Sequence, residues 1–269
     1  MSFRTIRSSR KFPAVLAALS LAVGVASGCA TRPDPQTEPE DYAYYVETND
    51  PLEPFNRAVF QFNEALDAML LTPLAILYRD VLPPIIQEGT HNVLVNLREP
   101  VVAANSLLQG KPRQAAATFA RFTFNTTAGV GGLVDVADGM GLPRERADFG
   151  QTLAIWGTPA GPYLVLPLLG PSNPRDAVGQ GVDSLVLDPL GLLNTIVSVD
   201  SDFVEILSYS RTGAEAVDGR ARSLEATDEL RRTSLDYYAA IRSAFRQSRE
   251  AAIDAGLDPD RVGAPGTGP

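Results

Sequence analysis

The stretch DPLEPFNRAVFQFNEALDAM, residues 50–69, decides the fold class of this chain. It opens with a candidate N-cap, Asp50, followed by proline at the first helical position and by an acid, Glu53, at the third. Apolar side chains then recur every three or four residues, at Leu52, Phe55, Val59, Phe62, Leu66 and Met69. This spacing places them along one side of a helix. The stretch therefore predicts an amphipathic helix that begins near Asp50.

Proline also precedes other helix-compatible segments, and glycines 110, 129 and 157 are expected helix stops. The proline dipeptides are Thr72-Pro73, Pro83-Pro84, Glu99-Pro100, Lys111-Pro112, Asn173-Pro174 and Asp188-Pro189. No alternating run of β-branched residues is long enough to predict a barrel. We therefore predict an all-α protein, a single compact domain of short, proline-started helices over residues 50–257.

The C-terminal part is predicted to be helical from residue 202 to residue 257, with an interruption between Gly213 and Gly219. One face of its last helix carries Leu235, Tyr238, Ile241 and Phe245. This face is expected either to pack on the body or to receive a partner. The tail over residues 258–269 is rich in proline and glycine, and we expect it to be disordered.

The N-terminus has the features of a bacterial lipoprotein signal. Four basic residues precede an uncharged run over residues 12–28, which ends in small residues before Cys29. This is typical of a secretory signal, and Cys29 is the only cysteine of the chain. We predict a signal peptide over residues 1–28 and lipidation of Cys29. The alternative is cleavage nearby, with Cys29 an ordinary apolar residue of the signal.

The next segment, residues 29–49, is acidic and contains prolines but few aliphatic residues. We expect it to be a flexible tether between the lipid anchor and the body. Ala30 follows the cysteine, and by resemblance to lipoprotein sorting the lack of an acid there favours the outer membrane. The whole chain has a net charge of −9 and no cluster of basic residues. A nucleic-acid partner is therefore not expected.

Residues 149–174 form a run of 26 residues without a charge. The run is long enough to span a membrane, but it contains five prolines and four glycines, which a continuous helix does not tolerate. Unpaired backbone groups are also excluded from lipid. The run is therefore expected to be covered by protein, to line a cavity or to lie at an interface. A buried core loop is the simplest alternative.

Motifs for catalysis and for cofactors are missing from the sequence. The glycine-rich residues 129–134 begin like a dinucleotide loop, but Val134 stands where the third glycine belongs. No Walker loop and no nucleophile elbow occurs. A single cysteine and a single histidine, His91, exclude a multi-cysteine or multi-histidine metal centre. We expect no catalytic residue, no metal and no cofactor.

Several ordered motifs resemble the MlaA (VacJ) family of outer-membrane lipoproteins. The resemblance covers about residues 50–190 and is specific because the motifs keep their order. They are Asp50 to Arg57, Tyr78-Arg79-Asp80, Asn96 to Pro100, Asn105, Gln109-Gly110, Arg121-Phe122, Asn125-Thr126, Gly131-Gly132, Asp135-Val136-Ala137, Phe149 to Leu153, Trp156-Gly157, Gly161-Pro162-Tyr163, Leu166-Pro167 and Arg175-Asp176.

The resemblance implies a ring-like helical protein that lies in the outer membrane on its periplasmic side and encloses an amphipathic channel. It also implies an outer-membrane porin trimer as a partner. Misplaced outer-leaflet phospholipid would pass through the channel to a soluble periplasmic lipid carrier, which keeps the membrane asymmetric.

Two sets of residues are candidates for this path. The expected lining residues are Phe62, Asn63, Phe122, Asn125, Thr126, Tyr163 and Leu166, each of which could equally be plain core. Family members have a gating loop that corresponds here to residues 149–166, with Gly150, Gly157 and Gly161 as bending points and Pro159 and Pro162 as limits. Two alternatives stay open: a lipid hydrolase that uses His91 as a base, and a structural lipoprotein.

Overall fold

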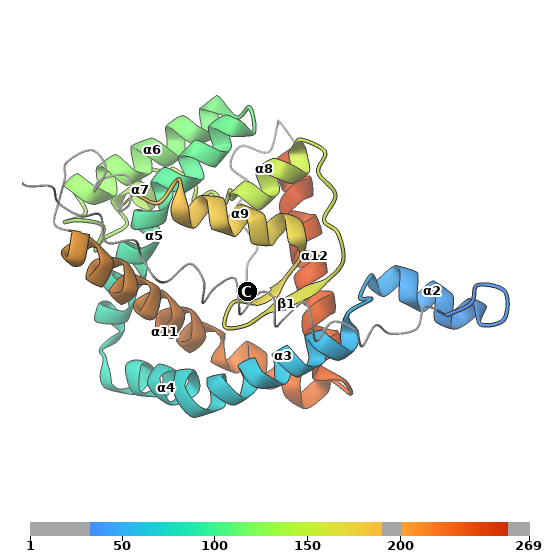
Figure 1. Cartoon of the computed structure of the whole chain (residues 1–269). Helices are drawn as coiled ribbons and strands as arrows, with labels where there is room; N and C mark the ends of the chain where they lie inside the picture. The colour runs from blue at the N-terminus through green and yellow to red at the C-terminus, as the bar shows by residue number, and fades with distance from the viewer. Residues whose placement is uncertain (1–32, 190–200, 258–269) are drawn as a thin grey trace, which may run out of the picture.

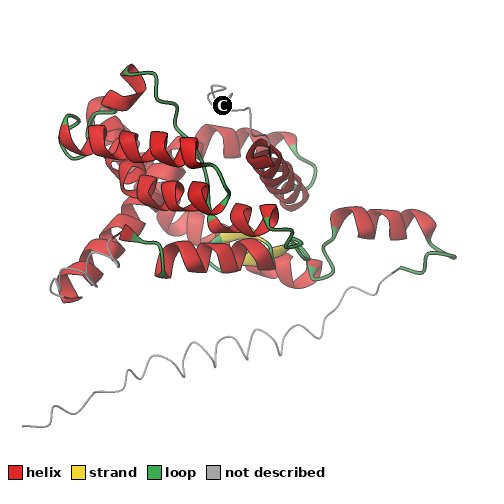
Figure 2. Ribbon diagram, turned by 90° about the horizontal axis from the view of Figure 1, so that it is seen from above, coloured by secondary structure: helices red, strands yellow, loops and turns green. Residues whose placement is uncertain are grey.

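The computed structural model describes residues 33–189 and 201–257, and these residues are mostly helical. The prediction of an all-α protein is confirmed, since one short antiparallel hairpin contains the only strands of the described residues. In Figure 1 the helices surround the hairpin as a ring, and Figure 2 shows the strands between helices from above. Four predicted features lie outside the described residues. They are the signal peptide over residues 1–28, the anchor Cys29, the segment over residues 190–200 that follows Asp188-Pro189, and the tail over residues 258–269.

One side of the ring is a nearly continuous helical rod. It consists of α3 (Glu53–Leu66), a π-helical turn η1 (Asp67–Leu71) and α4 (Thr72–Val81). The prediction that Asp50 caps α3 is wrong, because the helix begins at Glu53 and its first turn contains Pro54. Asp50 is instead buried, and its carboxylate accepts hydrogen bonds from three side chains, those of Asn56, Tyr238 and Arg242.

The next part is a pair of long helices, α5 (Pro84–Leu108) and α6 (Pro112–Thr127), which pack along each other. The helix start predicted at Glu99-Pro100 is wrong, because Pro100 lies inside α5. An interior proline costs a helix about 3 kcal/mol. Packing against α6 opposes this cost, since the buried Glu99 carboxylate accepts a hydrogen bond from Arg121 Nε at 3.2 Å.

The uncharged run of the sequence is built from several short elements. After the small helix α7 (Val136–Gly139) come α8 (Phe149–Ile155), the strands β1 (Leu164–Leu166) and β2 (Gly170–Ser172), and α9 (Pro174–Leu185). The strands pair antiparallel, with Leu164 opposite Ser172. Asp148 and Asn173 cap α8 and α9 by accepting hydrogen bonds from backbone N–H groups of their first turns.

The chain ends in two helices, α11 (Ser201–Thr233) and α12 (Tyr237–Leu257). The predicted interruption between Gly213 and Gly219 is wrong, because α11 runs unbroken through both glycines and packs on α4 and α5. The break lies instead between Thr233 and Tyr237. Leu235 is therefore in a turn, fully exposed, and not on the packed face with the buried Tyr238.

The expected flexible tether contains a helix, α2 (Pro39–Thr48), which extends away from the ring in Figure 1. Most of its described side chains are exposed, as expected for a segment without a core of its own. The helix ends at Thr48 and is capped by Asn49, which has a left-handed backbone with φ of 46°. The segment thus differs from the expectation because residues 39–48 form a helix. Its role as a tether stays a prediction.

The distribution of polarity is inverted relative to a water-soluble domain. Among the described residues, thirty large apolar side chains are exposed, whereas the buried set has ten apolar and sixteen polar or charged residues. Exposed apolar patches of this extent mark surfaces that contact lipid or protein. None of the described helices combines the length and the hydropathy needed to cross a bilayer.

Candidate lipid path

The hairpin is attached to α3 by two asparagine side chains that lie two helical turns apart, Asn56 and Asn63. The carboxamide of Asn56 accepts from Val165 N at 2.9 Å and donates to Tyr163 O at 3.1 Å. It therefore pairs with the edge of β1 as a neighbouring strand would. Because Asn56 is fully buried and also donates to Asp50 Oδ1 at 2.7 Å, this attachment is rigid.

Asn63 repeats this arrangement nearer the tip of the hairpin. Its Nδ2 donates to Leu166 O at 2.9 Å, and its Oδ1 accepts from Leu168 N at 2.9 Å. Asn63 was expected to line the path through its polar side chain. The carboxamide instead satisfies the backbone of the hairpin, so its contribution is to hold β1 in place.

Tyr163 belongs to the core rather than to an open lining. Its ring packs edge-on against Tyr238 at 6.1 Å and against Phe245 at 6.0 Å, and Val165 completes the buried cluster. Burial, together with the charge of Asp50, raises the pKa of the Tyr163 phenol, which keeps it neutral. The structure thus supports the simpler alternative for Tyr163, whereas its neighbour Leu166 is half-buried and Phe62 is exposed.

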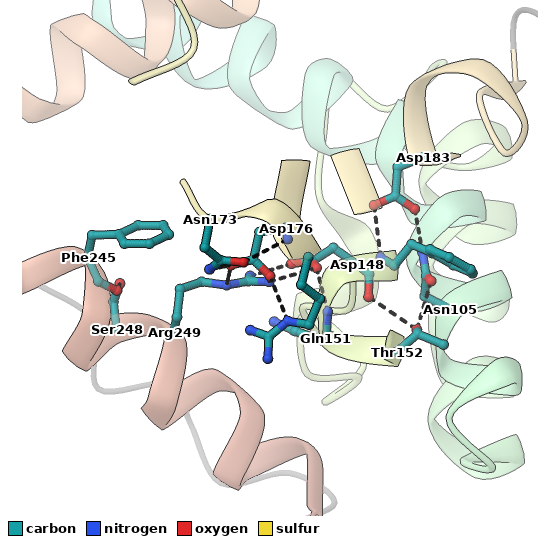
Figure 3. A network of polar contacts seen from close by, with 12 residues as sticks. Asn105, Asp148, Gln151, Thr152, Asn173, Asp176, Asp183, Phe245, Ser248 and Arg249 are labelled. Carbon is teal, nitrogen blue, oxygen red and sulfur yellow. Dashed lines mark hydrogen bonds and ion pairs between the residues drawn. The ribbon is translucent and has the colours of Figure 1, made fainter. Parts of the chain in front are cut away.

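Arg249 of α12 binds the two acids that lie just before and just after the uncharged run, Asp148 and Asp176, and we call these two ends the base of the run (Figure 3). Its guanidinium donates to both carboxylate oxygens of Asp148, at 2.7 and 3.1 Å, and to both of Asp176, at 2.8 Å each. Burial alone would raise the pKa of the Asp148 carboxyl, but hydrogen bonds from Arg249 and its charge outweigh burial, and the pKa is lowered. One arginine thus joins α8, α9 and α12.

Helices α8 and α9 cross at two glycines. A Cβ atom on Gly179 would lie 2.3 Å from Gly150 N, and one on Gly150 would lie 2.6 Å from Asp176 Oδ1. The neighbouring Asp183 carboxylate accepts from Phe149 N at 2.9 Å and from Asn105 Nδ2 at 2.8 Å (Figure 3). The expectation that Gly150 is a bending point therefore disagrees with the structure, because Gly150 is a tight helix contact.

The other gating candidates lie between α8 and β1. Gly157 has φ of +91° with open space around its Cα, and Pro159 is exposed. Gly161 has φ of +78° and lies against the ring of Pro174, while Pro162 is half-buried beside it. A cavity of about 170 Å³ adjoins Gly161 on the side of α12. Open space thus lies at Gly157 and beside Gly161, whereas Gly150 of α8 is tightly packed.

The expected lining residues of α6 lie away from the hairpin, beside α5 and α7. Asn125 is buried, and its carboxamide donates to Asp135 Oδ1 at 2.9 Å and accepts from Ala137 N at 3.0 Å. Thr126 is exposed and accepts from Asn96 Nδ2, and Phe122 is half-buried. Burial alone would raise the pKa of the Asp135 carboxyl. Hydrogen bonds from Asn125 and Arg121 outweigh burial, so the pKa is lowered. Asn125 is therefore structural.

Within the described part of the chain, the ring nitrogens of His91 contact a carboxylate and an arginine, not a nucleophile. Its Nδ1 lies 2.8 Å from Asp218 Oδ2, and its Nε2 lies 3.5 Å from Arg144 Nη1. A hydrolytic triad needs a hydroxyl or thiol at that second nitrogen. Arginine stands there instead, and the described residues contain no cluster of side chains suited to a metal ion.

Sequence reasoning missed Asn56, Asp148 and Arg249 as the residues that position the hairpin. Asn56 could have been noticed with Asn63, since the two polar residues share one side of an otherwise apolar helix. Asp148 precedes a helix as a typical N-cap. Arg249 had no local signal, because its partners lie about 70 and 100 positions away.

Many exposed apolar side chains around a buried set rich in polar residues, in a ring of helices, are typical of α-helical proteins that associate with membranes or with other proteins. A family model described as MlaA lipoprotein matches residues 48–252. The chain belongs to the MlaA lipoprotein family.

Curated relatives agree with this assignment. The chain is 34% identical over 246 residues to the intermembrane phospholipid transport system lipoprotein MlaA of Escherichia coli strain K12, covering 90% of this chain and 89% of the relative. It is 38% identical over 209 residues to an uncharacterized protein of Rickettsia felis, covering 77% and 79%. A solved structure, from a study of the structural basis for maintenance of bacterial outer membrane lipid asymmetry, matches with a TM-score of 0.65 and 36% identity. That match covers 76% of this chain and 98% of the solved one.

Proposed function

We propose that this protein removes mislocalised phospholipid from the outer leaflet of the outer membrane and passes it to a soluble periplasmic carrier. The result would be an outer membrane that keeps its lipid asymmetry. The names of the curated relatives support this proposal, since they describe intermembrane phospholipid transport.

The inverted distribution of polarity is the observation that carries the proposal. Exposed apolar side chains on α4 and on the start of α5, such as Leu77, Val81 and Ile85, suit contact with acyl chains. The helices satisfy their own backbone groups, so their apolar faces can lie in lipid. A phospholipid needs both an apolar route for its tails and polar groups for its head.

The anchor and the partners complete the proposal. Lipidated Cys29 would hold the chain on the periplasmic side of the outer membrane, and a porin trimer would hold the ring in place. No bond of the lipid is broken in this scheme. Arg144 beside His91 Nε2 supports transfer over hydrolysis, because the position of a nucleophile is occupied by a cation.

Residues 156–162 are the proposed gate. Their open surroundings at Gly157 and the cavity beside Gly161 would allow small rearrangements between β1 and the end of α8. Because Arg249 fixes Asp148 and Asp176, the base of the run stays still while the segment moves.

Gentle extraction of the native lipoprotein tests this function. The purified protein should carry phospholipid that survives exchange into fresh detergent, and it should co-purify with a porin. Mass spectrometry of the bound lipid gives the amount for each chain. Retention no greater than that of an unrelated outer-membrane lipoprotein, in the same detergent, would argue against a lipid path.

A further inference from the structure

The hairpin ends in an exposed apolar tip with an unusual backbone. Pro167, Leu168 and Leu169 connect β1 to β2, and Leu168 has φ of +67°. The side chains of Leu168 and Leu169 are 76% and 62% exposed. Glycine or asparagine normally occupies a left-handed position in such a connection.

The conformation of Leu168 opposes folding. The left-handed region costs a residue with a Cβ atom about 1–2 kcal/mol. Burial of an apolar side chain could offset this cost, but three quarters of Leu168 is exposed. Glycine would therefore suit the backbone at this position at least as well as leucine.

Asn63 presents this tip inside the ring. Its carboxamide binds Leu166 O and Leu168 N, and so fixes the backbone on both sides of Pro167. Figures 1 and 2 show the hairpin surrounded by helices. The tip is thus an apolar projection that Asn63 holds by two hydrogen bonds, on a hairpin that lies between helices.

Strain alone does not single out Leu168, as Val130 demonstrates. Val130 has φ of +55° and is 68% exposed, but it lies in the turn after α6, away from the hairpin. What distinguishes Leu168 is the clamp from Asn63 and the position within the ring. Val130 is therefore a matched control with similar backbone conformation and exposure.

We propose that Leu168 contacts the acyl chains of phospholipid as they pass the hairpin, and that Leu169 extends this contact. The inference rests on the proposed function and names a lipid-contact residue for it. An exposed apolar side chain at the tip offers the tails an apolar surface, so that they do not have to pass polar groups alone.

Leu168→Gly and Leu168→Met test the proposal, with Val130→Gly as the control. Each variant is made in the full-length lipoprotein and expressed as the only copy in its native cells, where phospholipid in the outer leaflet is measured. The melting temperature of each purified variant is measured in detergent. We expect Leu168→Gly to keep or raise the melting temperature, by up to about 2–4 °C, yet to leave outer-leaflet phospholipid at the level of cells that lack the protein. Leu168→Met and Val130→Gly should behave as the wild type does in cells.

Three results would overturn the inference. These are normal phospholipid levels with Leu168→Gly, a loss of function with Leu168→Met, or a marked fall in melting temperature with Leu168→Gly, which would make Leu168 a packing residue. A wild-type chain that fails to lower outer-leaflet phospholipid would instead contradict the proposed function. The two failures are therefore distinguishable.

Discussion

At the scale of single residues, buried polar side chains determine how the hairpin is held. Asn56 and Asp50 form the centre of this arrangement, together with Tyr238 and Arg242 of α12. The sequence indicated that Asp50 would cap a helix, because a carboxylate before proline has that local role. Local patterns contain no information on α12, which lies almost 190 positions later, so the buried cluster could not be predicted.

Asn56→Ala should destabilise the protein more than Asn63→Ala. The first change removes the asparagine partner of the buried Tyr163 O and Val165 N and one of the three hydrogen bonds to Asp50, and each buried group left unsatisfied costs about 1–3 kcal/mol. The second change affects groups near an exposed tip, where water can replace the amide. Thermal unfolding in detergent measures both effects, and equal losses would contradict the central place given to Asn56.

His91→Ala should leave lipid asymmetry intact. Asp218 keeps its hydrogen bonds from Tyr78 Oη at 3.1 Å and Arg222 Nε at 3.2 Å, so we expect a loss of stability of about 1 kcal/mol. Outer-leaflet phospholipid and protein abundance are the measurements. A folded variant without function, or phospholipid cleavage that depends on His91, would favour the hydrolase.

At the scale of elements, the helices of the ring were largely predictable and the hairpin was not. Periodic apolar residues and prolines at helix starts gave α3, α4, α6 and α9 their approximate positions, because both signals are local. The helix start predicted at Pro100 and the break predicted at the glycines of α11 were wrong, because packing on neighbouring helices outweighs local propensity there. The strands are only three residues long and depend on side chains of α3 for their pairing partners.

Gly179→Ala should disrupt the crossing of α8 and α9, whereas Gly181→Ala on the same helix should not. The new methyl group at position 179 would overlap Gly150 N, but nothing lies within 4 Å of a Cβ at position 181. Overpacking of this kind costs about 1–3 kcal/mol, whereas alanine in an open helical position gains about 0.5–1 kcal/mol. The measurement is the melting temperature of each variant. Similar values for Gly179→Ala and Gly181→Ala would contradict the tight crossing of α8 and α9.

Arg249→Met should remove a part of the stability that depends on pH. The pKa of Asp148 is lowered in the folded state, so its contribution is present above the unfolded value of about 3.9 and is lost as pH falls through the folded value. The difference in melting temperature between wild type and variant should therefore shrink as pH falls from about 5 to about 2. Arg246→Met is the control, since Arg246 binds the Glu47 carbonyl and should give no such trend. A constant difference for Arg249→Met would contradict the ion-pair account.

At the scale of the whole molecule, the helical class and the family followed from the sequence, and the distribution of polarity required the structure. The ordered motifs between Asp50 and Asp176 carried the resemblance, which the family match over residues 48–252 confirms. The side chains that line the path could not be predicted, because the type of a residue does not reveal where its side chain points. Asn63 and Asn125 were expected polar lining residues and Tyr163 an expected apolar one, but the two asparagines bind backbone groups and Tyr163 packs in the core.

Cys29→Ala should yield an uncleaved or soluble precursor. Stable attachment is expected to depend on the acyl chains of lipidated Cys29, at about 0.8 kcal/mol for each buried methylene. Membrane fractionation and intact mass measure the effect. Detection of membrane-bound wild type with an unmodified Cys29 would rule out this anchor.

The most direct test of the central claim is the amount of phospholipid in the outer leaflet of cells with and without this chain. Cells that lack the protein should accumulate surface-accessible phospholipid, and the wild-type gene should restore the low level. His91→Ala should restore it equally, while Cys29→Ala should not. If removal of the chain leaves outer-leaflet phospholipid unchanged, or if restoration depends on His91, transport through this ring is contradicted.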